Sequence, residues 1–207
     1  MKENCFISSY VVIRDQEVWR EGNLLYKDKN SAETGFLDQV YEFFEMNYPR
    51  FFKMDQLCKT GFLAAEILLK NQDWKAGLAP EELGIFISNA DSSLDTDIRY
   101  EESIAGTPSP SLFVYTLPNV LIGELCIRHQ VKGETACFVF DIFDPLFQSA
   151  YVDSLFETGK IKSCISGWAN YYNGKAEAYF YLVEKVEHKH SLKHDSATLN
   201  KIFKSNE

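Results

Sequence analysis

The chain has 207 residues, of which 45% are hydrophobic and 14% aromatic, so it can form one domain with a substantial core. Its 21 lysines and arginines are outnumbered by 30 aspartates and glutamates, and the net charge of -9 argues against nucleic acid or an anionic membrane as the main partner. The first ten residues lack a long apolar run, and no later stretch approaches the roughly 18 apolar residues of a membrane span. We therefore expect a cytoplasmic protein.

The first part of the chain predicts strands and then helices. Residues 5–13 are rich in β-branched and aromatic types, and residues 19–26 follow a turn, which indicates an opening strand or hairpin. Thr34 is a candidate N-cap for an amphipathic helix that ends before Pro49. Asp55 is a candidate N-cap for a second helix, whose small residues allow close packing.

The middle of the chain alternates strand and helix patterns. Residues 83–88, LGIFIS, form a short apolar run typical of a strand buried on both faces. A helix is expected around Leu121 and Leu125, and Gly123 within it suggests that another backbone passes close by. Residues 134–140, ETACFVF, predict another strand.

The last third continues the alternation. Asp144 is expected to cap a helix that ends at Gly159 and carries an apolar stripe. A strand follows, and the Asn173-Gly174 pair predicts a hairpin turn into the final confident strand. These patterns indicate an α/β fold with an antiparallel hairpin at the end of a largely parallel sheet. We expect one domain over residues 1–190 and a polar tail over 191–207 with a short helix after Asp195.

Cofactor and metal motifs are not evident. There is no GxGxxG or GxxxxGK pattern, so we expect no cofactor. The five cysteines form no CxxC pair and are odd in number, which indicates neither a zinc site nor a disulfide framework. His188, His190 and His194 fit a solvated tail better than a metal site.

The order of these patterns resembles the N-terminal half of a β-ketoacyl-[acyl carrier protein] synthase, a condensing enzyme of the thiolase-like superfamily. The stretches FFKMDQLCKTGFLAAEILL, LGIFIS and SPSLFVYTLPNVLIGELCIRHQVKGE resemble successive segments of that family, and the third is the most specific. The similarity spans roughly residues 40–186. It implies a thiolase-like half with a mixed, mostly parallel five-stranded sheet and helices on both faces.

The resemblance also indicates where a nucleophile would stand. In the family, the catalytic cysteine lies where a strand ends and a buried helix begins, so that the helix N-terminus stabilises the thiolate. Counting forward from Gly133 and backward from Gly159 places Ile142 at that position, whereas Cys137 falls inside the strand pattern. Isoleucine has no nucleophilic chemistry, and the family's catalytic histidines belong to the half that this chain does not match.

The resemblance thus implies a catalytically silent accessory protein of fatty-acid, polyene or polyketide biosynthesis. It would pair with an active ketosynthase or an acyl carrier protein as a homo- or heterodimer. Interface candidates are Asn119, near the family's dimer interface, and the helical residues Leu146, Phe147 and Tyr151, which need a cover.

Two alternatives remain open from the sequence. One is an acyltransferase that uses Cys137 or Cys164 together with residues of a partner subunit. The other is a module that binds a small ligand on a thiolase-like scaffold, since a fold does not determine a function. Covalent acyl loading would favour the first, and a defined apolar pocket would favour the second.

Overall fold

The computed structural model describes residues 5–28 and 35–205. The strands are β1 (Phe6–Arg14), β2 (Glu17–Arg20), β3 (Asn23–Lys27), β4 (Leu83–Asn89), β5 (Thr135–Val139), β6 (Ser163–Tyr172), β7 (Lys175–Glu184) and β8 (Leu192–Lys193). The α-helices are α1 (Phe36–Phe43), α2 (Gln56–Leu69), α3 (Leu94–Ile104), α4 (Pro110–Phe113), α5 (Val120–His129), α6 (Pro145–Glu157) and α7 (Ser196–Lys204). Two 3₁₀ turns complete the set, η1 (Pro49–Lys53) and η2 (Pro80–Glu82).

One mixed sheet organises the chain, with helices on both of its faces. The eight-stranded sheet has the order β3-β2-β1-β7-β6-β4-β5, and β8 pairs with β1. Among the described strands, β4 pairs in parallel with β5 and β6, and the other pairings are antiparallel. The α/β fold class is therefore confirmed, but the sheet is larger and less parallel than the expected five strands. The opening strands cause the difference, because β1 pairs with the distant β7 and brings its own hairpin into the same sheet.

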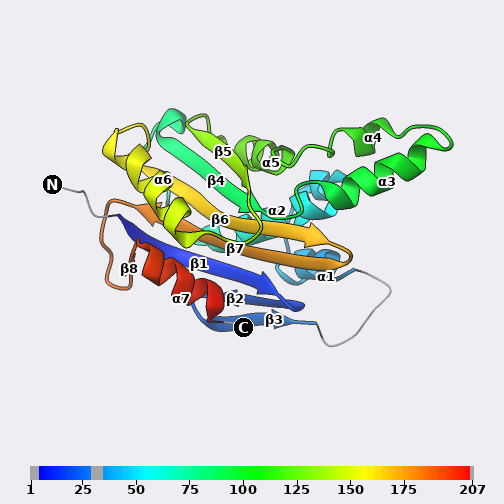
Figure 1. Cartoon of the computed structure of the whole chain (residues 1–207). Coiled ribbons are helices and arrows are strands. Elements are labelled where there is room, and N and C mark those ends of the chain that lie inside the picture. Colours follow the sequence, from blue (N-terminus) through cyan, green and yellow to red (C-terminus); the bar gives the residue numbers. More distant parts are fainter. Residues whose placement is uncertain (1–4, 29–34, 206–207) are drawn as a thin grey trace.

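Two hydrophobic cores lie on opposite sides of this sheet. Helix α2 covers the central strands on one side together with α1 and α5, and α6 and α7 cover the other side (Figure 1). Strand β4 is buried along its whole length, as its apolar sequence predicts. In Figure 1, α3 and α4 extend away from the sheet beyond the end of β4. No helix within the described residues is long and apolar enough to cross a membrane.

Local sequence signals account for many element ends. Asp55 caps α2 by accepting a hydrogen bond from the backbone N–H of Cys58, and Asp144 caps α6. Asn173 and Gly174 both have positive φ, as the expected tight hairpin between β6 and β7 requires. The expected cap Thr34 lies outside the described residues.

Glycines show which close approaches the fold needs. A Cβ at Gly61 of α2 would lie 2.4 Å from Leu121 Cδ1, so this glycine lets α5 pack closely on α2. Gly123 differs, because a Cβ there would meet no atom of residues 5–28 and 35–205 within 4 Å. The expectation that another backbone passes close to Gly123 is therefore wrong.

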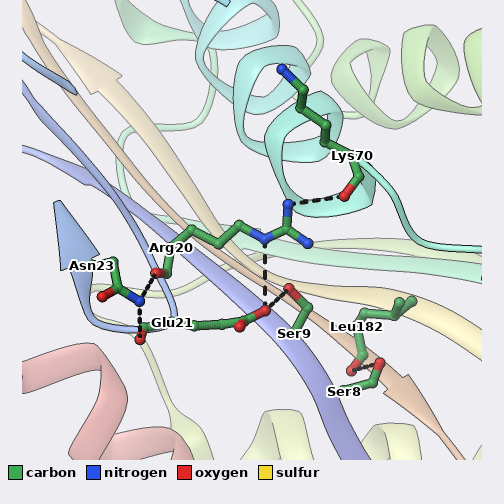
Figure 2. Close-up of polar contacts among 7 residues, drawn as sticks. All are labelled: Ser8, Ser9, Arg20, Glu21, Asn23, Lys70 and Leu182. Carbon is green, nitrogen blue, oxygen red and sulfur yellow. Dashed lines mark hydrogen bonds and ion pairs between the residues drawn. The ribbon is translucent and has the colours of Figure 1, made fainter. Parts of the chain in front are cut away.

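A polar cluster ties the β2–β3 hairpin to the end of α2 (Figure 2). Arg20 donates from Nη1 to the carbonyl oxygen of Lys70 at 2.9 Å and so satisfies one terminal carbonyl of α2. Its Nε lies 3.6 Å from Glu21 Oε1, which also accepts a 2.7 Å hydrogen bond from Ser9 Oγ. The Lys70 side chain extends away from the cluster, so its ammonium group takes no part in it.

The C-terminal segment is packed rather than solvated. Helix α7 buries Leu199 and Ile202 against the second core. His194 is 3% exposed, and its Nδ1 lies 2.8 Å from Asp153 Oδ1 of α6 in a hydrogen bond. The expectation of a solvated histidine tail is thus wrong for His194, whereas His188 and His190 are exposed.

Candidate functional site: the junction of β5 and α6

Cys137 lies in β5, away from the helix that a catalytic cysteine would need. It pairs with Ile87 of β4 and packs against the core on the α2 side of the sheet, opposite α6. Burial raises the pKa of its thiol to about 11, so the group is protonated at neutral pH. Burial is the cause of this shift, and no charged group among the described residues opposes it. The environment of Cys137 is that of a structural cysteine.

Ile142 lies in the short connection between β5 and α6. Its side chain is 75% exposed, and the next residue, Phe143, is buried in the second core. Asp144 is the N-cap of α6, and its Oδ1 accepts hydrogen bonds from the backbone N–H groups of Leu146 at 3.0 Å and Phe147 at 2.9 Å. The N–H groups that could stabilise an anion at this helix N-terminus therefore already bind a carboxylate. The junction is built for a helix cap next to an exposed isoleucine.

The remaining candidates for nucleophilic chemistry are buried. Cys164 of β6 is 0% exposed, and burial raises the pKa of its thiol well above its ordinary value. His129 lies in the last turn of α5, on the opposite side of the sheet from His194. Since the cysteine is inaccessible and protonated, it lacks the two properties of an activated nucleophile.

The apolar stripe expected on α6 is only partly covered. Leu146 is 68% exposed, and Phe147 and Tyr151 are half-buried. The residues that α6 does bury are Gln148, Ser149, Val152, Leu155 and Phe156. The interface candidates on this helix thus lie on a face that the chain itself leaves open.

Aromatic rings connect this open face of α6 to β5. Phe138 lies 4.9 Å from Phe147 and 5.0 Å from Tyr151 between ring centroids, and Phe140 lies 4.9 Å from Phe147. Within the described residues, β5 pairs with β4 alone and ends the sheet. We call this region the β5 edge surface; it comprises the free edge of β5 and the side chains of Phe138, Phe140, Ile142, Leu146, Phe147 and Tyr151.

A buried glutamine, which the sequence pattern did not indicate, fixes α6 to the sheet beneath this surface. Gln148 is 2% exposed, and its Nε2 donates to the carbonyl oxygen of Phe86 at 2.9 Å and to Ser166 Oγ at 2.8 Å. A buried amide needs such partners, because an unpaired polar group is costly to bury. The sequence pattern identified only apolar residues as the buried face of this helix, so a polar residue was not expected there. The partners of Gln148 lie on β4 and β6, and the pairing of these two strands brings them together.

Asn119 does not lie next to the other interface candidates that the sequence suggested. It is exposed and occupies the N-cap position of α5, but its side chain makes no capping hydrogen bond. It lies before α5 on the α2 side of the sheet, whereas Leu146 belongs to α6 on the other side. Ordinary capping chemistry thus does not explain this residue.

Solved structures share this fold. One is described as the type II PKS acyl-carrier protein in complex with its ketosynthase bound to the hexaketide (AntDE:AntF); it aligns with a TM-score of 0.63 and 15% identity over 89% of this chain and 63% of that chain. The ishigamide ketosynthase/chain length factor aligns with a TM-score of 0.64 and 15% identity over 90% of this chain and 63% of that one. The ketosynthase ApeO in complex with its chain length factor ApeC from Xenorhabdus doucetiae aligns with a TM-score of 0.53 and 10% identity. The alignment covers 87% of this chain and 79% of that chain.

These likenesses define the fold. The chain has the thiolase-like fold, and its structural neighbours are ketosynthase and chain length factor proteins. It spans 63% of the length of the first two neighbours. No protein-family model matches the sequence, and a search of curated proteins finds no match.

Proposed function

We propose that this protein is a catalytically silent ketosynthase-like partner in polyketide, polyene or fatty-acid assembly. It would pair with a condensing enzyme through the β5 edge surface and act by supporting that enzyme or its acyl carrier protein. The single observation that carries the proposal is a free strand edge flanked by uncovered apolar side chains at the junction where a ketosynthase would keep its cysteine. The structural neighbours are described as complexes of this kind.

The chemistry of the junction supports a silent role. Ile142 offers no nucleophile, and Asp144 already occupies the helix N-terminus with its carboxylate. The acyltransferase alternative needs Cys137 or Cys164 as a thiolate, and burial opposes that charge at both positions.

The β5 edge surface is also of a kind that a monomeric protein rarely exposes to solvent. An edge strand presents unpaired N–H and C=O groups, and contiguous exposed apolar side chains mark sites of protein association. Ile142 and Leu146 are 75% and 68% exposed next to that edge. A partner strand and its apolar face would satisfy both features at once.

Co-purification with single substitutions tests this proposal. Leu146→Asp and Ile142→Asp place a charge in the β5 edge surface, whereas Val186→Asp, at a residue 60% exposed beyond the end of β7, is the matched control. We expect a condensing enzyme to co-purify with the wild type and the control, and its affinity for the two surface variants to fall at least about tenfold. All three substituted side chains are exposed, so thermal unfolding should change little.

Two results would contradict the proposal. One is that neither a condensing enzyme nor a carrier protein of the same pathway binds the wild-type chain. The other is that both surface variants bind the partner as tightly as Val186→Asp does.

A further inference from the structure

A second site lies on the opposite side of the sheet from α6. A cavity of about 440 Å³ opens at the C-terminal ends of α2 and α5. It is lined by charged residues and by aromatic and apolar ones, namely Phe44, Glu45, Met46, Asn47, Glu66, Ile67, Leu69, Lys70, Trp74, Lys75, Arg128 and His129. This size suits a small organic molecule.

Two lysines place their ammonium groups over aromatic rings of this cavity. Lys70 Nζ lies 5.6 Å from the Phe44 ring centroid, and Lys75 Nζ lies 5.4 Å from that of Trp74. Neither lysine has a carboxylate within ion-pair distance in the part of the chain that the structure describes.

The carboxylate of Glu66, which lines the cavity, is already paired with Arg128. Glu66 accepts hydrogen bonds from Arg128 Nε at 3.0 Å and from Arg128 Nη2 at 2.7 Å. The other acidic residue, Glu45, is exposed at the rim. The ammonium groups of Lys70 and Lys75 therefore provide positive charge in the cavity that no carboxylate of the described residues pairs with.

His129 adds a buried polar group without a hydrogen-bond partner. It is 8% exposed, and its Nε2 makes no hydrogen bond among residues 5–28 and 35–205, although Glu66 Oε1 lies 3.3 Å away. Burial lowers the pKa of its imidazole to about 4, so the ring is neutral at pH 7 and keeps one donor and one acceptor nitrogen. A buried polar atom of this kind is expected to have a partner.

Capping of helix ends explains only part of this arrangement. Lys75 donates to the backbone carbonyl of His129, and Arg20 satisfies that of Lys70. These contacts account for carbonyls at the ends of α5 and α2. They involve neither the ammonium group of the exposed Lys70 nor Nε2 of His129, whose neighbour among the described residues is Glu66 Oε1 at 3.3 Å.

We propose that this cavity binds a small organic anion with an apolar body and one carboxylate or phosphate group. Lys70 and Lys75 would hold the anionic group, Trp74 and Phe44 would pack on the apolar body, and His129 Nε2 would bond to a polar group of the ligand. This inference does not rest on the proposed partner function, because the cavity and the β5 edge surface lie on opposite sides of the sheet.

Titration of the full chain followed by NMR tests this site. The probes are hexanoate, hexyl phosphate and neutral hexanol, and the signals are the His129 ring and the Trp74 indole N–H. We expect saturable shifts with at least one of the two anions and none with hexanol. The stronger anion then distinguishes a carboxylate ligand from a phosphate ligand.

Charge-removing variants localise the binding. Lys70→Met and Lys75→Met should each weaken it about tenfold, because each removes a charge-assisted contact. Lys201→Met on α7 removes an exposed charge on the far side of the sheet and should leave it unchanged. Lys70 is exposed and does not cap α5, so its variant stays informative if Lys75→Met folds poorly.

The site assignment would be overturned by either of two results. One is the absence of saturable shifts for either anion up to about 10 mM, beyond the range of ordinary ligand affinities. The other is equal binding by Lys70→Met and Lys201→Met, or by hexanol and the anions. Co-purification of a condensing enzyme with Lys70→Met should be unaffected, so this proposal and the partner proposal can fail separately.

Discussion

Single residues at the β5–α6 junction determine what chemistry the fold can perform. Cys137 has the residue type of a nucleophile but lies on the α2 side of a strand, where burial keeps it protonated. Asp144 has the position that stabilises negative charge, and its carboxylate uses that position to cap α6. The thiol and the helix N-terminus are therefore separated, whereas an activated cysteine needs both together.

The thiol of Cys137 should react slowly at neutral pH. With a pKa of about 11, its thiolate fraction at pH 7 is about one in ten thousand, and it rises about tenfold per pH unit until pH approaches 11. An unfolded cysteine has a pKa near 8.5, so iodoacetamide should label Cys137 at least about a hundredfold more slowly in the folded chain. Peptide mass spectrometry of folded and urea-unfolded protein measures this ratio. Equal labelling rates at pH 7 would show that the thiol is activated or accessible.

At the scale of elements, the contact of α2 with α5 depends on a glycine. The β-carbon of an alanine at position 61 would lie 2.4 Å from Leu121 Cδ1, and Leu121 is 2% exposed and cannot move aside freely. Gly61→Ala should therefore destabilise the protein by about 1–3 kcal/mol through overpacking. Gly123→Ala is the matched change within α5 and should stabilise it by about 0.5–1 kcal/mol, because nothing lies within 4 Å of the added carbon. Urea unfolding of both variants measures these effects, and a Gly61→Ala variant as stable as Gly123→Ala would contradict this packing.

The cap of α6 is a second test at this scale. Asp144→Ala removes two hydrogen bonds to backbone N–H groups and should cost about 1 kcal/mol of unfolding free energy. Asp144→Asn keeps an acceptor oxygen, so this variant should lose only a few tenths of a kcal/mol of unfolding free energy. Chemical denaturation distinguishes the two variants, and equal losses would mean that the charge matters rather than the hydrogen bonds.

Local elements were more predictable from the sequence than their pairing. The caps Asp55 and Asp144 and the Asn173-Gly174 turn act within a few residues, so their chemistry is visible in the chain. The pairing of β1 with β7 joins residues about 170 positions apart, and no local pattern encodes it. Strand β8 was missed for a similar reason, since it pairs with β1, which is distant in sequence.

The sequence likewise predicted some features of the candidate site and missed others. The sequence could place an isoleucine at the junction and an apolar stripe on α6, but it could not show that β5 is the free edge beside them. It also could not show that Gln148 reaches two strands, or that His129 and Lys75 line one cavity. These facts depend on the order of strands and the layering of helices.

For the whole molecule, the C-terminal segment completes the second core. His194 bonds to Asp153, and α7 buries Leu199 and Ile202 over the sheet. His194→Ala should therefore loosen α7 and raise its amide hydrogen exchange, with a loss of about 1 kcal/mol from the lost hydrogen bond to the half-buried Asp153. His190→Ala, at an exposed histidine, is the control. Unchanged exchange in α7 of the His194 variant would mean that apolar packing alone holds the segment.

The β5 edge surface and the β5–α6 junction, where Asp144 caps the helix beside Ile142, carry the proposed partner role. Its most direct test is intact mass spectrometry of the assembly that co-purifies with the wild-type chain, after incubation with acyl-carrier-protein thioesters. We expect a condensing enzyme in the assembly, an acyl adduct on that enzyme and none on this chain. An acyl adduct on Cys137 or Cys164 would instead make this chain an enzyme and refute the proposed silent role.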